Sequence, residues 1–219
     1  PDAHLVQRNY QKARLTAETV ALAEGAVAVC VFVNDVLGAD VLQALSTRGV
    51  KAVLLRCAGF NNVDLTMAKK LGFFVARVPS YSPEAVAEHT LALVMTLNRH
   101  THRAYLRVRE GNFMLEGLLG STLHGKTIGI IGIGKIGLAV ARIFKGIGCR
   151  VLGYDPFRSP EFERIGEYFD REALLAQADI VTLHCPLTDD TRHLINANTL
   201  STMKPGAMLI NNARGGVVN

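Results

Sequence analysis

The chain has 219 residues, of which 49% are hydrophobic and 20% charged, and its net charge is +5. This composition excludes a disordered chain and suits one large or two small domains with a buried core. The longest unbroken apolar run, residues 26–33, is far shorter than the ~20 residues that span a bilayer, and the first residues show no basic n-region followed by an apolar h-region.

The cysteines lack C-x-x-C spacing, so neither a zinc site nor a disulfide framework is suggested. They stand at positions 30, 57, 149 and 185. We therefore expect a cytoplasmic protein with reduced thiols, no metal and no membrane partner.

Residues 1–80 alternate between short apolar segments and amphipathic segments, which predicts a parallel sheet with crossover helices. The predicted strands are residues 26–33, 50–56 and 73–78, and the predicted helices are residues 16–24, 39–47 and 63–71. Residues 4–7 are the candidate for an earlier strand. The sequence LRCAGFNNVD at 55–64 ends a strand and opens a helix, so its small residues could leave backbone N–H groups free for an anion. An ordinary strand-to-helix turn would have the same pattern.

Residues 79–83, Pro-Ser-Tyr-Ser-Pro, form a predicted loop, and Pro83 suits the first turn of a helix. We expect that helix to run from residue 84 to about 110 and to connect two domains, residues 1–98 and 99–219. Its basic cluster between Arg99 and Arg109 could face a nucleic acid, but a solvated helix is the simpler interpretation, so no nucleic-acid partner is expected.

A glycine-rich turn follows the next predicted strand. Residues 127–131 are an apolar, β-branched run, and Gly132, Gly134 and Gly137 then form G-x-G-x-x-G, after which apolar residues recur at helical spacing over 135–147. In a dinucleotide site the first glycine permits a tight turn, the second lets the backbone approach a pyrophosphate, and the third lets helix and strand pack closely. The helix N-terminus offers unpaired N–H groups to the anion.

Asp155 ends the following strand, residues 151–154, and lies 23 residues after Gly132. An acid at this place accepts hydrogen bonds from the adenosine ribose and repels a 2′-phosphate, which predicts NAD over NADP. Alternatively, Asp155 is only a turn residue before Pro156.

The rest of the chain continues the alternation. The predicted helices are residues 161–166, 171–178 and 196–203, and the predicted strands are residues 180–184 and 208–212. Ligands of open parallel sheets bind outside the carboxyl ends of the strands, so Gly132, Asp155, Cys185 and Arg214 should share one rim.

Arg214 is the first candidate for chemistry, because it follows a buried strand and precedes two glycines. Its guanidinium could hold a substrate carboxylate and polarise a carbonyl, although a surface or capping arginine would look the same. His184 reads as structural more readily than catalytic, and the other histidines show no spacing typical of a metal or nucleophile site.

Several segments together resemble the D-2-hydroxyacid dehydrogenase family, and within it most the bacterial D-lactate dehydrogenases. They are LRCAGFNNVD at 55–64, VPSYSPEAVAEH at 78–89, NRHTHRAYLRVREGNF at 98–113, GIGKIG at 132–137, HCPLT at 184–188 and NNARGGVVN at 211–219. The resemblance implies an α/β protein with two doubly wound parallel-sheet domains, a flavodoxin-like substrate domain and a Rossmann NAD-binding domain, with NAD in the cleft between them. It also implies a homodimer that interconverts a 2-oxoacid and a D-2-hydroxyacid, with pyruvate and D-lactate as the expected pair.

Carried over residue by residue, the resemblance implies that Arg214 is the catalytic arginine. It also implies that the backbone of Ala58 and Gly59 binds the substrate carboxylate and that Tyr81 lies near the substrate. The cofactor residues that it implies are Gly132, Gly134, Lys135, Ile136, Gly137, Asp155, Cys185, Pro186, Ala213 and Arg214. Lys135 and Ile136 would meet the phosphates, and the last four would meet the nicotinamide end.

The family pattern continues beyond this sequence. A glutamate and a proton-donating histidine follow the ARG motif in the family, as does a segment that completes the first domain, and the pattern has Asp where this chain has Asn219. We therefore expect a C-terminal part to be missing and this chain alone to turn over poorly, since a positioned acid–base group contributes about 10²- to 10⁴-fold.

Other functions share the same fold. An NADH-sensing binding protein like the C-terminal-binding-protein corepressors would bind partners without turnover. Glyoxylate or hydroxypyruvate reductase and phosphoglycerate dehydrogenase differ from a lactate enzyme in pocket shape, which the sequence reveals poorly.

Overall fold

The computed structural model describes residues 8–80 and 82–219 and divides into two compact units, 1–81 and 82–219. The division precedes helix α3 (Pro83–Arg99), instead of lying near residue 98 as expected. The reason is packing: α3 lies along helix α5 (Lys135–Ile147) and contributes to the same hydrophobic core. The strand proposed at residues 4–7 falls outside the described residues.

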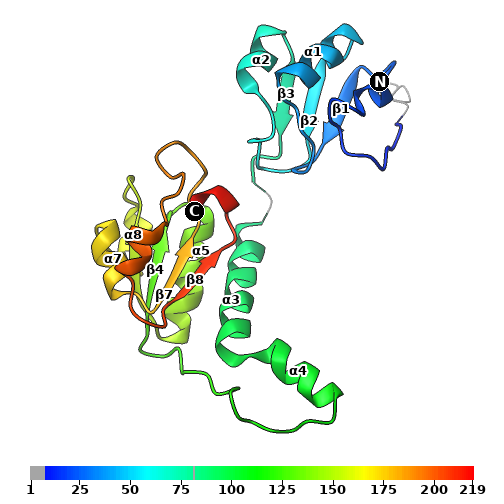
Figure 1. The fold of residues 1–219 in the computed structure, drawn as a ribbon. Coiled ribbons are helices and arrows are strands. Elements are labelled where there is room, and N and C mark those ends of the chain that lie inside the picture. The colour runs from blue at the N-terminus through cyan, green and yellow to red at the C-terminus, as the bar shows by residue number, and fades with distance from the viewer. Residues whose placement is uncertain (1–7, 81) are drawn as a thin grey trace, which may run out of the picture. The chain divides into compact units, whose positions relative to one another are not determined.

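The first unit holds a parallel sheet of three strands in the order β1-β2-β3 (Figure 1). The strands are β1 (Ala28–Val31), β2 (Ala52–Leu55) and β3 (Phe74–Arg77), and the helices between them are α1 (Ala39–Thr47) and α2 (Leu65–Lys70). All five were predicted, α1 with its observed bounds and the other four one or two residues too long at each end. Their apolar sides form one cluster that includes Val31, Leu42, Leu45 and Val53.

The helix predicted at residues 16–24 is wrong, because only a 3₁₀ turn, η1 (Val20–Ala23), forms there. Thr19 Oγ1 accepts the backbone N–H of Thr16 at 2.9 Å and donates to the carbonyl of Arg14. Such local side-chain bonds to the backbone compete with helix formation.

The second unit holds five parallel strands in the order β6-β5-β4-β7-β8. They are β4 (Thr127–Ile131), β5 (Arg150–Tyr154), β6 (Glu167–Tyr168), β7 (Ile180–Leu183) and β8 (Met208–Asn211), joined by α5, α6 (Pro160–Glu163), α7 (Arg171–Gln177) and α8 (Ala197–Ser201). The chain then ends in a 3₁₀ turn, η2 (Gly215–Val217). The strand order runs outward in both directions from β4, and ligands of such sheets bind at this switch point.

Both faces of this sheet are buried. Alternate strand residues point to opposite faces, so Ile128 and Ile130 of β4 join the core with α3 and α5, while Ile131 joins the core with α7. Figure 1 shows α7 and α5 on opposite sides of the strands. The predicted α/β Rossmann architecture is therefore confirmed.

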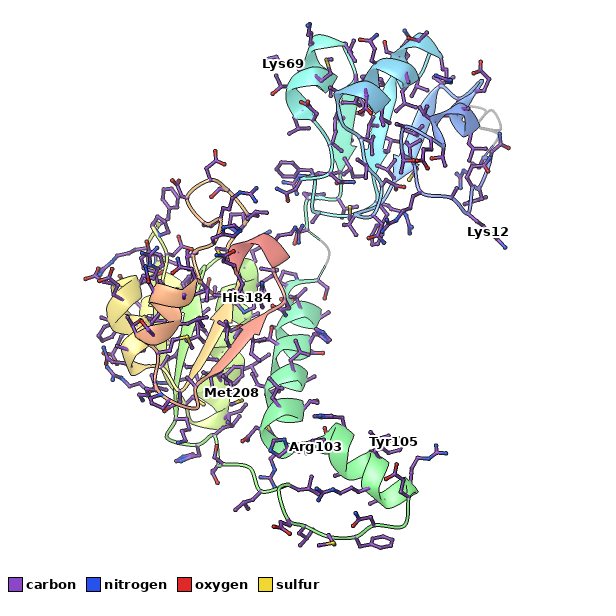
Figure 2. All side chains as sticks on the ribbon, viewed as in Figure 1. Lys12, Lys69, Arg103, Tyr105, His184 and Met208 are labelled. Atoms are coloured by element: carbon purple, nitrogen blue, oxygen red, sulfur yellow. The ribbon has the colours of Figure 1, made fainter. Side chains whose placement is uncertain are left out.

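The long helix predicted over residues 84–110 is interrupted. His100 adopts a left-handed conformation with φ 51°, which ends α3 and precedes α4 (Thr101–Arg109). The Asn98 side chain ties this end of α3 to Ser121, donating to its carbonyl at 2.7 Å and accepting its N–H at 2.9 Å. Helix α4 buries none of its residues, and Figure 2 shows Arg103 and Tyr105 on it. Among the described residues, no helix is long and apolar enough to cross a bilayer.

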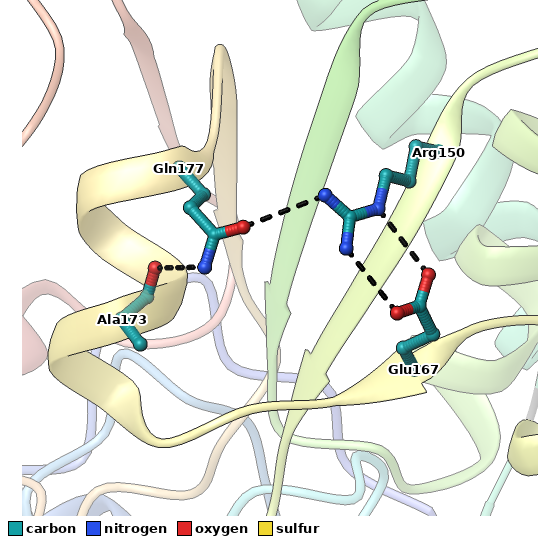
Figure 3. Close-up of polar contacts among 4 residues, drawn as sticks. All are labelled: Arg150, Glu167, Ala173 and Gln177. Atoms are coloured by element: carbon teal, nitrogen blue, oxygen red, sulfur yellow. Dashed lines mark hydrogen bonds and ion pairs between the residues drawn. The ribbon is translucent and has the colours of Figure 1, made fainter.

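Strand β6 has two residues and was not predicted. Arg150 at the start of β5 donates to both carboxylate oxygens of Glu167 at 3.2 Å, and to Gln177 Oε1 of α7 at 3.4 Å (Figure 3). The hydrogen bond from Arg150 lowers the pKa of Glu167. This contact joins β5, β6 and α7 at the amino end of the sheet, opposite to the end that carries Asp155.

Candidate functional site

The carboxyl ends of three strands meet at Gly132. It follows β4 with φ +96° and donates its N–H to the Tyr154 carbonyl at 2.9 Å. A Cβ here would collide with the backbone of His184 and Cys185 after β7, so only glycine fits. The predicted convergence of these strand ends is confirmed, and the parallel order places Arg214, after β8, at the same edge.

Helix α5 begins directly behind this turn. Gly134 is its N-cap, with no side-chain cap, and a Cβ at Gly134 would meet nothing within 4 Å. Gly137 is the opposite case, because its Cβ would fall on the carbonyl of Gly132. The first turn of α5 therefore packs closely against the end of β4 at Gly137, whereas the space around Gly134 is open. Lys135 is exposed there and Ile136 is half-buried. Unpaired N–H groups at such an end attract anions.

The Asp155 carboxylate is fixed by two backbone groups. Oδ2 accepts the N–H of Ile133 at 2.7 Å, and Oδ1 accepts the N–H of Phe157 at 2.8 Å. The bond from Phe157 shows that Asp155 also acts as the turn residue that the sequence analysis gave as the alternative. The bond from Ile133 holds the carboxylate against the glycine turn. Because each carboxylate oxygen has two lone pairs, each can accept one more hydrogen bond, for example from a ribose hydroxyl.

The backbone of His184 and Cys185 packs against Gly132 of the glycine turn. His184 Nε2 is 2.9 Å from Thr182 Oγ1, and burial lowers the pKa of His184 to about 4, so the ring is neutral at pH 7. Burial, with a smaller effect of the Asp155 charge, raises the pKa of the Cys185 thiol. A protonated, buried thiol is a poor nucleophile, so Cys185 offers contact surface instead of reactivity. Pro186, the next residue, is exposed.

The segment after β8 is held by an asparagine that the sequence pattern did not single out. Asn211 Oδ1 accepts the N–H of Ala213 at 3.1 Å, and its Nδ2 donates to the Arg214 carbonyl at 2.9 Å. The Arg214 side chain is exposed, with Nη1 on the Ala213 carbonyl at 2.8 Å. Asn211 thus fixes the backbone while the guanidinium stays accessible. An asparagine at a strand end is a known turn signal and could have been found.

Asn212 connects the same segment to α3. Its Nδ2 donates to Thr90 Oγ1 at 2.8 Å and to the Val86 carbonyl at 3.3 Å, and Thr90 is fully buried. The segment that carries Arg214 is therefore attached to the helix packed against α5.

In the first unit, Ala58 and Gly59 lie in the loop after β2, and both are half-buried. Within residues 8–80 and 82–219, their backbone N–H groups donate to no other group. Consecutive free N–H groups of this kind can bind an anion. Tyr81, the third predicted substrate residue, lies outside the described residues.

Known proteins of similar sequence and structure share this arrangement of elements. Residues 91–219 match the NAD binding domain of D-isomer specific 2-hydroxyacid dehydrogenases. The chain is 60% identical to D-lactate dehydrogenase kk1H of Curvularia clavata, over 98% of this chain and 62% of that protein. The apo-structure of D-lactate dehydrogenase from Escherichia coli has a TM-score of 0.87 and 51% identity, over 94% of this chain and 66% of that one.

A third similar structure was solved with a cofactor and a substrate bound. The crystal structure of D-lactate dehydrogenase from Aquifex aeolicus, complexed with NAD and lactic acid, has a TM-score of 0.83 and 38% identity, over 91% of this chain and 60% of that one. The chain thus spans less than two thirds of these proteins. The domain match covers more than half of the chain and includes the glycine turn, Asp155 and Arg214, so this chain belongs to the NAD-binding D-isomer specific 2-hydroxyacid dehydrogenases.

Proposed function

We propose that the full-length protein interconverts pyruvate and D-lactate with NAD. The observation that carries the proposal is the bond from Ile133 to Asp155, because it places a carboxylate beside a glycine turn at a helix N-terminus. That combination suits a dinucleotide. The relatives named as D-lactate dehydrogenases support this substrate pair.

For the cofactor, the α5 N-terminus and Lys135 would bind the pyrophosphate, and Asp155 the adenosine ribose. Cys185, Pro186, Ala213 and Arg214 would contact the nicotinamide end. The nicotinamide, when bound, supplies or accepts the hydride. The protonated state of the Cys185 thiol keeps a second negative charge away from this rim.

For the substrate, the Arg214 guanidinium would pair with the carboxylate and polarise the reacting carbonyl. The N–H groups of Ala58 and Gly59 would bind the carboxylate, and Tyr81 would lie near the substrate, as the family resemblance implies. The neutral His184 has its Nε2 on Thr182, so we assign it no proton transfer. In the family a later histidine delivers that proton.

The test is NADH oxidation by the full-length protein with pyruvate, compared with glyoxylate, hydroxypyruvate and longer 2-oxoacids. We expect the highest kcat/KM for pyruvate and a product of D configuration. The 219-residue chain carries the glycine turn and Asp155, so it should bind NADH by itself. Full-length protein that binds NADH and oxidises it with none of these acids would contradict the proposal.

We also propose a homodimer formed through α4 and the segment after it. Large apolar side chains there are solvent-exposed: Tyr105, Leu106, Val108, Phe113, Met114, Leu115 and Leu119. Leu115 is 82% and Leu119 92% exposed. So many exposed large apolar side chains within one short segment are typical of an interface. The four free cysteines suit a cytoplasmic location, which we propose as well.

A further inference from the structure

We propose that Arg77 is a positioning residue for the substrate carboxylate. It fixes the peptide group between Ala58 and Gly59 so that the N–H of Gly59 faces the carboxylate. The inference rests on the proposed function, since it takes this loop to be where the 2-oxoacid carboxylate binds.

Three consecutive carbonyl groups of the loop are bonded back to the chain. The Cys57 carbonyl accepts the N–H of Val78 at 3.3 Å, and the Ala58 carbonyl accepts Nη1 of Arg77 at 3.1 Å. The Gly59 carbonyl accepts the Cys57 thiol at 3.3 Å. The orientation of each peptide group in this stretch is therefore set by its carbonyl.

The orientation of the carbonyls also sets that of the N–H groups. The described chain has no cis peptide bonds, and in a trans peptide the C=O and N–H point in opposite directions. With the Ala58 carbonyl on Arg77, the N–H of Gly59 points away from that guanidinium. Neither this N–H nor that of Ala58 donates to another group among the described residues. Both N–H groups are therefore free to bind an anion.

Arg77 also changes the strength of that donor. A guanidinium on a carbonyl oxygen polarises the whole peptide group, and hydrogen bonds in a chain strengthen one another in this way. The Gly59 N–H should therefore bind a carboxylate more strongly than an ordinary amide would.

The Arg77 side chain is itself held in place. It extends from the last residue of β3, its guanidinium carbon lies 5.3 Å from the centre of the Phe60 ring, and Nη1 is also 3.5 Å from the Pro79 carbonyl. A planar guanidinium can stack on a ring and donate in its own plane at once. Lysine keeps the charge but not this geometry.

Arg56 provides a matched control. It follows β2, and its guanidinium carbon lies 4.4 Å from the centre of the Phe32 ring. Among the described residues its side chain donates no hydrogen bond to the Ala58–Gly59 loop. Arg56→Gln removes the same charge from the neighbouring strand end and leaves the loop contacts intact.

The experiment compares wild type, Arg77→Gln, Arg77→Lys and Arg56→Gln in the full-length protein. The measurements are KM and kcat for pyruvate, the Kd of the pyruvate analogue oxamate with NADH present, and the Kd of NADH. We expect Arg77→Gln to raise KM and the oxamate Kd roughly tenfold, the size of one charge-assisted hydrogen bond. Since the carboxylate is bound equally in ground and transition states, kcat should change less than about twofold. The NADH Kd should stay the same, Arg77→Lys should be intermediate, and Arg56→Gln should stay within about threefold.

Equal effects of Arg77→Gln and Arg56→Gln would show a general charge effect and overturn the proposal. So would a loss of kcat at constant KM. If Arg77→Gln does not fold, Arg77→Lys decides, because a wild-type KM in that variant is incompatible with a role for the guanidinium geometry. Wild-type protein that binds neither pyruvate nor oxamate overturns the proposed function itself, which separates the two failures.

Discussion

Asp155 Oδ2 accepts the backbone N–H of Ile133 at 2.7 Å, so the acid that should select the cofactor sugar also holds the glycine turn that should bind its phosphates. A substitution of Asp155 should therefore weaken binding of both the adenosine ribose and the pyrophosphate.

Asp155→Asn should weaken NADH binding roughly tenfold and narrow the preference for NADH over NADPH, because the charge that repels a 2′-phosphate is lost. Fluorescence titration with both cofactors measures this. Glu163→Gln is the control, because it removes an equal negative charge from the same unit. Glu163 forms an ion pair with Arg158 at 3.7 Å and is not part of the proposed cofactor site. An unchanged NADH to NADPH ratio in Asp155→Asn would rule out the assigned role.

Substitutions at two glycines of the turn should have different effects, one on cofactor binding and the other on stability. Gly134→Ala should cost less than about 1 kcal/mol of stability, because the added methyl meets nothing within 4 Å and only the N-cap preference for glycine over alanine is lost. It should weaken NADH binding at least about tenfold, because the pyrophosphate would pass there. Gly137→Ala should lower stability by about 1–3 kcal/mol, because the methyl collides with the Gly132 carbonyl.

Thermal melts and NADH titration of both variants test this pair. Gly146→Ala, on the same helix with nothing within 4 Å, controls for a glycine-to-alanine change alone and should be neutral or stabilising. Normal NADH affinity in Gly134→Ala would place the cofactor elsewhere.

The regular elements were predictable because the interactions that form them are local. Strand β4, the glycine turn, α5 and Asp155 lie within 30 residues, and each has its own periodicity or turn chemistry. The site residues at the rim of the second unit follow from strand order, which a βαβ alternation largely determines.

Two of the errors arise from contacts between distant residues, whereas the helix wrongly predicted at residues 16–24 is prevented by local bonds of Thr19. The break at His100 accompanies the bonds between Asn98 and Ser121, and β6 depends on the pairing of Arg150 with Glu167. No local pattern records either pair. The bond from Arg77 to Ala58 likewise joins two strand ends 19 residues apart and becomes visible only in the fold.

The half-buried His184 should make the free energy of unfolding depend on pH. Its pKa is lowered from 6.5 to about 4, so the unfolded chain binds this proton more readily than the folded one. Its contribution is complete above about pH 6.5 and declines as the pH falls toward 4, with about 2 kcal/mol lost at pH 5. Urea unfolding at pH 7 and pH 5 measures this loss. His184→Gln should show a correspondingly smaller difference between the two pH values, and an identical pH dependence in both proteins would contradict the assignment.

The exposed apolar side chains after α4 predict an effect on assembly. The double variant Leu115→Glu, Leu119→Glu should convert a dimer of the full-length protein to a monomer without changing its Tm by more than a few degrees, because both side chains are more than 80% exposed within one chain. Sedimentation velocity distinguishes the two states. Leu22→Glu is the control, as an exposed leucine of the first unit, and should leave the dimer intact. A double variant that stays dimeric would place the interface elsewhere.

The Asn211 side chain should matter for turnover more than for folding. Asn211→Ala removes the bonds to Ala213 and Arg214 and should lower kcat/KM for pyruvate roughly tenfold, because the backbone that carries the guanidinium is no longer fixed. The loss of two partly exposed hydrogen bonds should cost only about 1–2 kcal/mol of stability. Asn211→Asp keeps the acceptor for the Ala213 N–H but not the donor to the Arg214 carbonyl, so its activity should fall between those of wild type and Asn211→Ala. Steady-state kinetics with a Tm for each variant test this order. Full activity in Asn211→Ala would mean that Arg214 is positioned by other contacts, of which the attachment of Asn212 to Thr90 is the next to test.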